Sequence, residues 1–256
     1  MADFDNRAIR GRADSAGAID AGLRSYMLRV YNYMLVALLV TGFTAYGVYS
    51  LSVTSDPAAA ALILPHGLML TKFGLTLFGS PLRYVAMFAP IVAVLVLQVR
   101  LNSISVGAAQ LGFWAFAALL GVSMSSIFLL YVNTSIATVF FITAAAFGGL
   151  SLYGYTTSRD LSGFGSFLIM GVWGIFIALI VNMFLASPMI MWVVSVLGVG
   201  IFAALTAYDT QAIKNLYSEH NDGTVTGRNA IRGALYLYLD FINMFQFLLY
   251  LMGNRR

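Results

Sequence analysis

Apolar runs long enough to cross a bilayer alternate with short polar segments along most of the chain. Seven such runs occupy about 30–53, 84–99, 106–131, 136–155, 164–185, 189–208 and 231–252. A membrane-spanning α-helix needs about 20 predominantly apolar residues, and these runs lack the short alternating pattern of membrane β-strands. Because unpaired backbone groups are not tolerated in hydrocarbon, the pattern predicts an all-α integral membrane protein, a bundle of seven transmembrane helices.

Two segments outside these runs are not expected to span a membrane. Residues 1–29 mix both charge signs with Gly and Ser, which predicts a flexible, solvated N-terminal tail and leaves 30–256 as the membrane domain. The segment 54–83 is rich in proline and holds only a short apolar piece, so we expect a loop or an interfacial segment there.

Small residues recur four positions apart inside the apolar runs. The pairs are Ala144 and Gly148, Ala145 and Gly149, and Ala203 and Ala207. Such spacing lets the backbones of two membrane helices approach closely. We therefore interpret these pairs as helix-packing positions.

Composition and charge agree with a membrane protein and add an orientation. The 256 residues are 60% hydrophobic and 9% charged, too few charges to cover a soluble domain of this size. With the N-terminus in the cytoplasm, ten Lys and Arg residues lie inside and four outside, which favours that orientation. Seven full crossings place Arg255 and Arg256 outside, against the trend, so an incomplete last crossing stays open. The net charge of +4 is spread over short loops, so nucleic acid is not an expected partner.

Two aspartates fall within the apolar runs. Asp209 ends the sixth run, and Asp240 lies about nine residues into the seventh. Both are expected in the cytoplasmic half of the membrane, because the favoured orientation makes the connection between these two runs cytoplasmic. Polar neighbours share a helix face with each aspartate, Thr206 with Asp209, and Tyr236 and Asn243 with Asp240. Such polar stripes should face protein or water rather than lipid.

A charged carboxylate at this depth costs about 2.5–3.5 kcal/mol on insertion scales, so it must be paired, hydrogen-bonded or protonated. Two carboxylates within hydrogen-bonding reach can share one proton and titrate as a unit. We therefore expect Asp209 and Asp240 to act as a pH sensor. The alternative is a structural role in which hydroxyl and amide groups lock each aspartate.

The C-terminal part of the chain resembles the transmembrane Bax inhibitor motif family in three runs, YDTQAIKN, ALYLYLDFIN and LLYLMG, and its middle in RDLSGFGSFLIMG and NMF. The resemblance extends from about Met34 onward. It implies a bundle whose last helix is central and wrapped by the other six. It also implies that Asp209 and Asp240 form a hydrogen-bonded pair that gates a calcium leak, and that Arg100 is the latch for Asp209.

The expected function is therefore a pH-sensitive calcium-leak channel of a bacterial inner membrane. Its partners would be the lipid bilayer, calcium and protons, with no enzymatic activity and no cofactor. Calcium normally takes six to eight oxygen ligands, so Asp209 and Asp240 alone would bind a calcium ion only transiently. Weak binding suits conduction, because an ion that enters must also leave.

Two other functions stay open. The charged tail 1–29 would suit a regulator of a membrane-bound quality-control protease, as the resemblance to bacterial relatives implies. Intramembrane aspartyl proteases also place a Tyr-Asp pair on one helix and an aspartate on the next. Their second motif, Gly-x-Gly-Asp, is absent around Asp240, and a motif without its context is weak.

Overall fold

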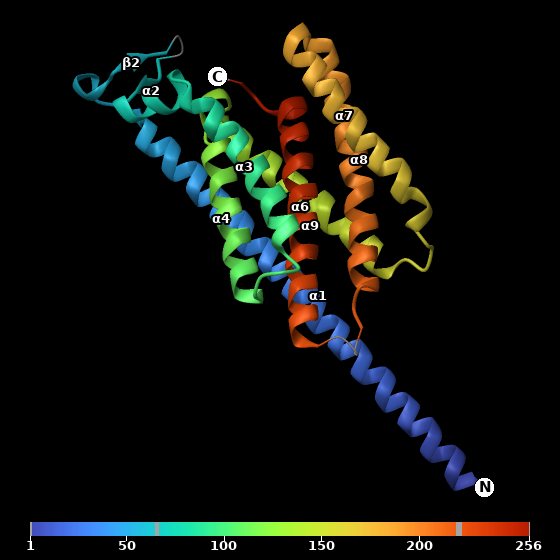
Figure 1. Ribbon diagram of the computed structural model, residues 1–256. Helices are drawn as coiled ribbons and strands as arrows, with labels where there is room; N and C mark the ends of the chain where they lie inside the picture. Colours follow the sequence, from blue (N-terminus) through green and yellow to red (C-terminus); the bar gives the residue numbers. More distant parts are fainter. Residues whose placement is uncertain (1, 65–66, 219–221, 256) are drawn as a thin grey trace.

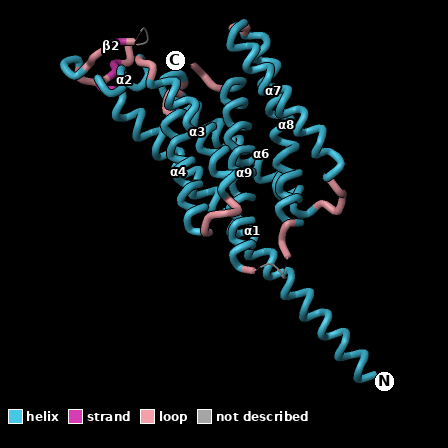
Figure 2. Tube along the Cα trace, viewed as in Figure 1, coloured by secondary structure: helices cyan, strands magenta, loops and turns pink. Residues whose placement is uncertain are grey.

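A computed structural model describes residues 2–64, 67–218 and 222–255, with side chains from residue 21 onward, and these ranges are almost entirely helical (Figure 1; Figure 2). Seven helices are long and apolar enough to cross a membrane: Ala21–Ser52, Leu82–Arg100, Val106–Leu130, Asn133–Thr156, Ser162–Leu185, Pro188–Asn215 and Gly223–Met252. Each one overlaps a predicted apolar run, so the prediction of an all-α membrane protein with seven spans is confirmed.

The bundle consists of α1 (Ala2–Ser52), α3 (Leu82–Arg100), α4 (Val106–Met124), α6 (Asn133–Thr156), α7 (Gly165–Leu185), α8 (Pro188–Asn215) and α9 (Gly223–Met252), with a short α5 (Ile127–Leu130) after α4. Side chains cap several helix starts. Ser105 accepts a hydrogen bond from the backbone of Ala108 at the start of α4, and Asp222 accepts one from Val225 at the start of α9. These caps satisfy N–H groups that have no partner within the helix.

The last helix is central, as expected. In the apolar stretch of α9, 56% of the residues are buried inside the bundle, against at most 33% for any other span. Its main partners are α8, α1, α6 and α4, whereas α3 packs mainly on α4 and α7 mainly on α8 (Figure 1). Four helices rather than six therefore form the main wall around α9.

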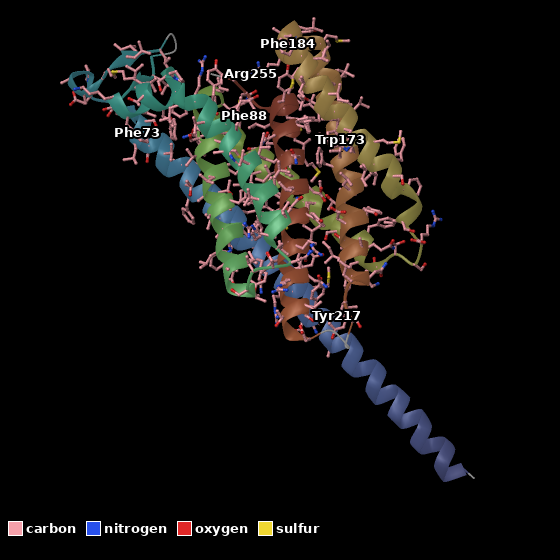
Figure 3. The ribbon with its side chains drawn as sticks, in the orientation of Figure 1. Phe73, Phe88, Trp173, Phe184, Tyr217 and Arg255 are labelled. Carbon is pink, nitrogen blue, oxygen red and sulfur yellow. The ribbon has the colours of Figure 1, made fainter. Side chains whose placement is uncertain are left out.

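The outer faces of the bundle carry large apolar side chains. Phe88, Trp173 and Phe184, labelled in Figure 3, are 49%, 61% and 79% exposed. An apolar surface of this extent would be a liability in water. It matches the hydrocarbon environment of a membrane span.

The first helix begins far earlier than the sequence predicted. The expected tail 1–29 belongs to α1, which starts at Ala2, and Tyr26 and Met27 are each 3% exposed in the core. They stand one turn before Val30 on the same apolar face, so the boundary at residues 29 and 30 is wrong. The sequence hid this because charged residues interrupt the run on the other faces of the helix. The N-terminal part of α1 projects beyond the bundle (Figure 1).

The first loop folds into a cap at the end of the bundle opposite the N-terminus (Figure 1). Its antiparallel sheet has the strand order β1 (Val53–Thr54), β3 (Met69–Leu70) and β2 (Leu62–Ile63), and α2 (Lys72–Gly79) follows. The described part of this loop contains no helix of spanning length, in agreement with the sequence analysis.

The last helix runs the full length of the bundle, and the two termini lie at opposite ends (Figure 1). The C-terminal segment is fastened at that far end. The backbone N–H of Val132 donates to the Asn254 carbonyl at 3.0 Å, and the Asn254 N–H donates to Ser135 Oγ at 2.9 Å. The Arg255 guanidinium lies 4.8 Å from the centre of the Tyr250 ring. The suggestion that the last helix stops short is therefore wrong.

Candidate functional site

Successive residues near the end of α8 contact different neighbouring helices, because each helical residue is rotated by about 100° from the one before. The Tyr208 ring packs at the start of α7, where a Cβ added to Gly165 would meet its hydroxyl at 2.6 Å. Asp209 faces α9. Thr210 Oγ1 lies 3.0 Å from Ser151 Oγ on α6. The YDT run therefore connects α8 to three helices at one level of the bundle.

Side chains of the next turn of α8 form hydrogen bonds with the end of α6 and with the connection that follows α6. Gln211 accepts a hydrogen bond from the backbone of Leu161 and donates one to the Arg159 carbonyl, both at 2.8 Å. Lys214 Nζ donates to the Tyr155 carbonyl at 2.8 Å and lies 5.2 Å from the centre of the Tyr155 ring. These contacts fix the position of the helix that carries Asp209.

Asp209 of α8 and Asp240 of α9 meet inside the bundle. Their carboxyl groups are in hydrogen-bonding contact. Asp240 is only 4% exposed and Asp209 is partly buried. Among the described residues, no N–H or hydroxyl group donates to Oδ2 of Asp240. Because an ionised carboxylate can only accept hydrogen bonds, a bond between the two groups requires a proton on one of them.

The pair has no further strong ligand for a metal ion. Nowhere in the described parts of the chain do three His, Asp or Glu side chains come close enough to hold one. Tight calcium sites use six to eight oxygens. The arrangement can therefore offer a passing cation a weak contact rather than a closed site.

The three polar residues expected beside the pair do not hydrogen-bond to it. Thr206 Oγ1 donates to the Phe202 carbonyl and Asn243 Nδ2 donates to the Leu239 carbonyl, each at 2.8 Å within its own helix. Tyr236 is 37% exposed at the periphery. Thr206 is buried and Asn243 is partly buried, so both face protein as expected, but backbone carbonyls one turn earlier take up their donors. Tyr236 instead faces outward.

The buried tyrosine of α9 is Tyr238, which the sequence analysis missed. It is fully buried, and its hydroxyl lies 2.6 Å from Thr41 Oγ1 on α1, which in turn lies 3.0 Å from the Ala117 carbonyl of α4. The signal was present in the sequence. Tyr238 follows Leu235 by three positions and precedes Ile242 by four, the spacing of one apolar helix face.

Arg100 does not reach the aspartate pair. It is the last residue of α3 and its side chain is exposed, and among the described residues no ion pair joins it to Asp209. Leu97 and Leu101 are 6% and 1% exposed and face the bundle, whereas Val99, at 80%, and Arg100 are exposed. The predicted latch is absent from this structure.

Two arginines of α9 hold the connection between α3 and α4. Arg228 Nε donates to the Ile104 carbonyl at 3.0 Å, and Arg232 Nη2 donates to Asn102 Oδ1 at 2.5 Å. In the sequence, both arginines indicate only the orientation of the chain. They tie the end of α3 to the same helix that carries Asp240.

Comparisons with known proteins agree with this architecture. A family model described as "Inhibitor of apoptosis-promoting Bax1" matches residues 23–256. The chain is 42% identical to a Caulobacter vibrioides protein over the full length of both. It is 42% identical to the Rickettsia prowazekii protein RP147, over 93% of this chain and 92% of that protein. It is 41% identical to the inner membrane protein YbhL of Escherichia coli K12, over 96% of this chain and 98% of that protein.

Proposed function

Because the chain belongs to the Bax inhibitor family of membrane proteins, we propose that it is a pH-sensitive calcium-leak channel gated by Asp209 and Asp240. The observation that carries the proposal is the contact of these two carboxyl groups inside the bundle. Ionisable residues at such depth typically belong to ion or proton pathways. The likeness to the inner membrane protein YbhL supports a bacterial inner membrane as the location.

The gate depends on the number of protons that the pair holds. One shared proton leaves a single negative charge and a short hydrogen bond between α8 and α9. Loss of that proton places two like charges side by side in a medium of low dielectric constant, where their repulsion is strong. Gain of a second proton removes the charge that strengthens the bond. Either change weakens the contact between the two helices.

Calcium would pass beside α9, down its gradient. Two carboxylates bind the ion too weakly to retain it, as conduction requires. The hydrogen bonds of Arg228 and Arg232 hold the α3–α4 connection against α9 in the closed arrangement. Opening would require the α3–α4 connection to separate from α9 and break these hydrogen bonds.

We assign no proteolytic reaction to the pair. An aspartyl protease activates a water molecule between two carboxyl groups that a peptide can approach. Asp240 is 4% exposed and lies on the central helix. A cleavage assay on the purified protein would revive this function if it gave a product that disappears with either Asp→Asn substitution.

Conduction itself is tested with the full-length protein in liposomes that enclose a calcium-sensitive dye. We expect calcium to enter faster than into protein-free liposomes, and Asp240→Asn to alter that rate. Asp160→Asn is the matched control, because Asp160 is an exposed acid in the α6–α7 connection. Wild-type liposomes that fill no faster than empty ones would end the proposal.

A second candidate function is regulation of a membrane-bound quality-control protease. The N-terminal part of α1 projects beyond the bundle, where another protein could reach it (Figure 1). Deletion of residues 1–20 leaves the first span Ala21–Ser52 intact. Loss of partner capture with unchanged calcium flux would favour regulation, and the reverse result would favour the channel alone.

A further inference from the structure

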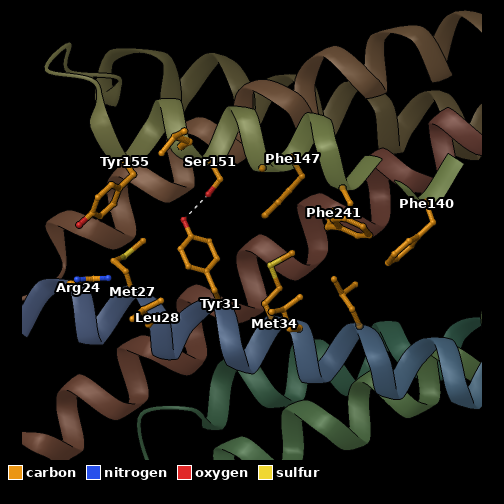
Figure 4. Close-up of a pocket in the computed structure, with 15 residues that line it drawn as sticks. Arg24, Met27, Leu28, Tyr31, Met34, Phe140, Phe147, Ser151, Tyr155 and Phe241 are labelled. Carbon is orange, nitrogen blue, oxygen red and sulfur yellow. Dashed lines mark hydrogen bonds between the residues drawn. The ribbon is translucent and has the colours of Figure 1, made fainter. Parts of the chain in front are cut away.

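A cavity of about 680 Å³ opens between α1 and α6 (Figure 4). Both helices pack against α9, and Phe241 of α9 closes the cavity on the inner side. A second cavity of about 270 Å³ continues along the same helices toward the opposite end of the bundle. Leu38, Phe140 and Phe241 line both cavities. Together they form one long depression, here called the α1–α6 groove.

The predicted packing pair Ala144 and Gly148 lines this groove rather than a helix contact. A Cβ added to Gly148 would meet no atom within 4 Å. Small residues at this spacing let a neighbour approach closely, yet no helix in the described part of the chain fills the space. Atoms that line an empty void forfeit their dispersion contacts. The groove therefore offers a binding surface to something apolar from the surrounding bilayer.

One end of the groove is basic. Arg24 and Tyr155 line it there, and Arg24 also belongs to an adjoining polar recess on α1 together with Ser25, Arg29 and Asn32. Among the side chains that the structure describes, from residue 21 onward, no acidic one lines the two cavities or this recess. This end therefore complements an anion at the level where the bundle leaves the membrane.

The wall between the basic end and the apolar floor carries hydroxyl groups. Tyr31 Oη lies 2.6 Å from Ser151 Oγ (Figure 4). Ser151 Oγ in turn lies 3.0 Å from Thr210 Oγ1. Going along the groove, polarity thus changes from guanidinium to hydroxyl to hydrocarbon. That order matches the phosphate, the ester region and the acyl chain of a phospholipid.

We propose that the α1–α6 groove binds one anionic phospholipid, with its phosphate at Arg24 and an acyl chain along Gly148 and Phe241. The volume falls in the range of about 300–1,000 Å³ that is typical of small-molecule sites. Basic pockets between membrane helices bind anionic headgroups. An α-helix is about 10–12 Å across with its side chains, and an acyl chain is much thinner. The acyl chain can therefore lie between α1 and α6 on top of α9, which forms the floor of the groove.

The full-length protein is extracted from vesicles of phosphatidylcholine with a minor share of phosphatidylglycerol, and retained lipids are counted by native mass spectrometry. We expect wild type to retain one phosphatidylglycerol. Gly148→Leu fills the groove and should abolish retention, while Arg24→Gln should weaken it about fivefold. Gly149→Leu and Arg159→Gln are the matched controls and should retain the lipid, because Gly149 has open space around it and lies outside both cavities, and Arg159 is exposed.

The proposal is overturned if Gly149→Leu loses lipid as Gly148→Leu does, or if phosphatidylcholine is retained equally well. Displacement by glycerol phosphate would show that the site takes a free anion rather than a lipid. A wild-type dimer that Gly148→Leu converts to a monomer would show that a second copy fills the groove. If Gly148→Leu does not fold, Ala144→Leu fills the same cavity from one turn earlier and must give the same loss.

Discussion

The two flanks of α9 differ sharply in how they are packed. Towards α8 the contact is tight, since a Cβ on Gly233 would lie 2.9 Å from the Ile213 side chain and one on Gly198 would lie 2.5 Å from the Phe247 ring. Towards α1 and α6, Phe241 instead forms the floor of a groove. The tight flank holds the carboxyl pair in one geometry. The open flank leaves space for a ligand from the membrane.

The same contrast appears on the two faces of α6. A Cβ on Gly154 would collide with the Ala207 carbonyl of α8, whereas one on Gly148 would meet nothing within 4 Å. The two glycines are six residues apart and so point in different directions from the helix axis. A small residue on a membrane helix therefore marks close approach on one face and an opening on another.

The largest expected effect comes from alanine at these two glycines. Gly154→Ala should destabilise the protein by about 1–3 kcal/mol or more, because the new methyl group meets a backbone carbonyl that cannot turn aside. Gly148→Ala should be neutral or stabilising by up to about 1 kcal/mol, since alanine favours the helix. Unfolding in detergent micelles measures both. Equal losses at the two positions would remove the distinction between the packed and open faces of α6.

A second comparison uses the two tyrosines of α9. Tyr238→Phe removes the hydrogen bond to Thr41 and should cost about 1 kcal/mol. Tyr236→Phe should change the free energy of unfolding by less than about 0.5 kcal/mol, because Tyr236 is 37% exposed. The same unfolding measurement applies. If Tyr236→Phe lowered the free energy of unfolding more than Tyr238→Phe, the assignment of Tyr238 to the inward face of α9 and of Tyr236 to its outward face would be incorrect.

The smallest effect concerns the wall of the groove. Tyr31→Phe breaks the hydrogen bond to Ser151 and should cost about 0.5 kcal/mol, since this contact is only partly buried. Tyr33→Phe, two residues later on α1, is the control. Combining Tyr31→Phe with Ser151→Ala should cost less than the sum of the single changes, as expected for partners in one network. Strict additivity would show that the two hydroxyl groups act independently.

The strongest inferences from the sequence concerned features that physics makes obligatory. Seven apolar runs had to be helices, because backbone groups must be paired in hydrocarbon. An aspartate within such a run had to find a partner or lose its charge. The encounter of Asp209 with Asp240 follows from that requirement and from the antiparallel course of α8 and α9.

The inferences that failed depended on the direction in which a side chain points. Arg100 is exposed although Leu97 and Leu101 near it face the bundle, and Tyr236 faces outward while Tyr238 faces inward. The spacing of Ala144 and Gly148 predicted close approach, and a groove lies there instead. A single helix sequence gives the relative angles of its residues but not the rotation of the helix within the bundle.

The central claim is that protonation of Asp209 and Asp240 controls passage through the bundle. Its most direct test is calcium entry into liposomes across a pH series, for wild type, Asp209→Asn and Asp240→Asn. We predict that the wild-type rate changes with pH and that the response is lost or strongly reduced in both variants, because an amide cannot exchange the shared proton. If all three proteins conduct alike at every pH, the aspartate pair is not the gate.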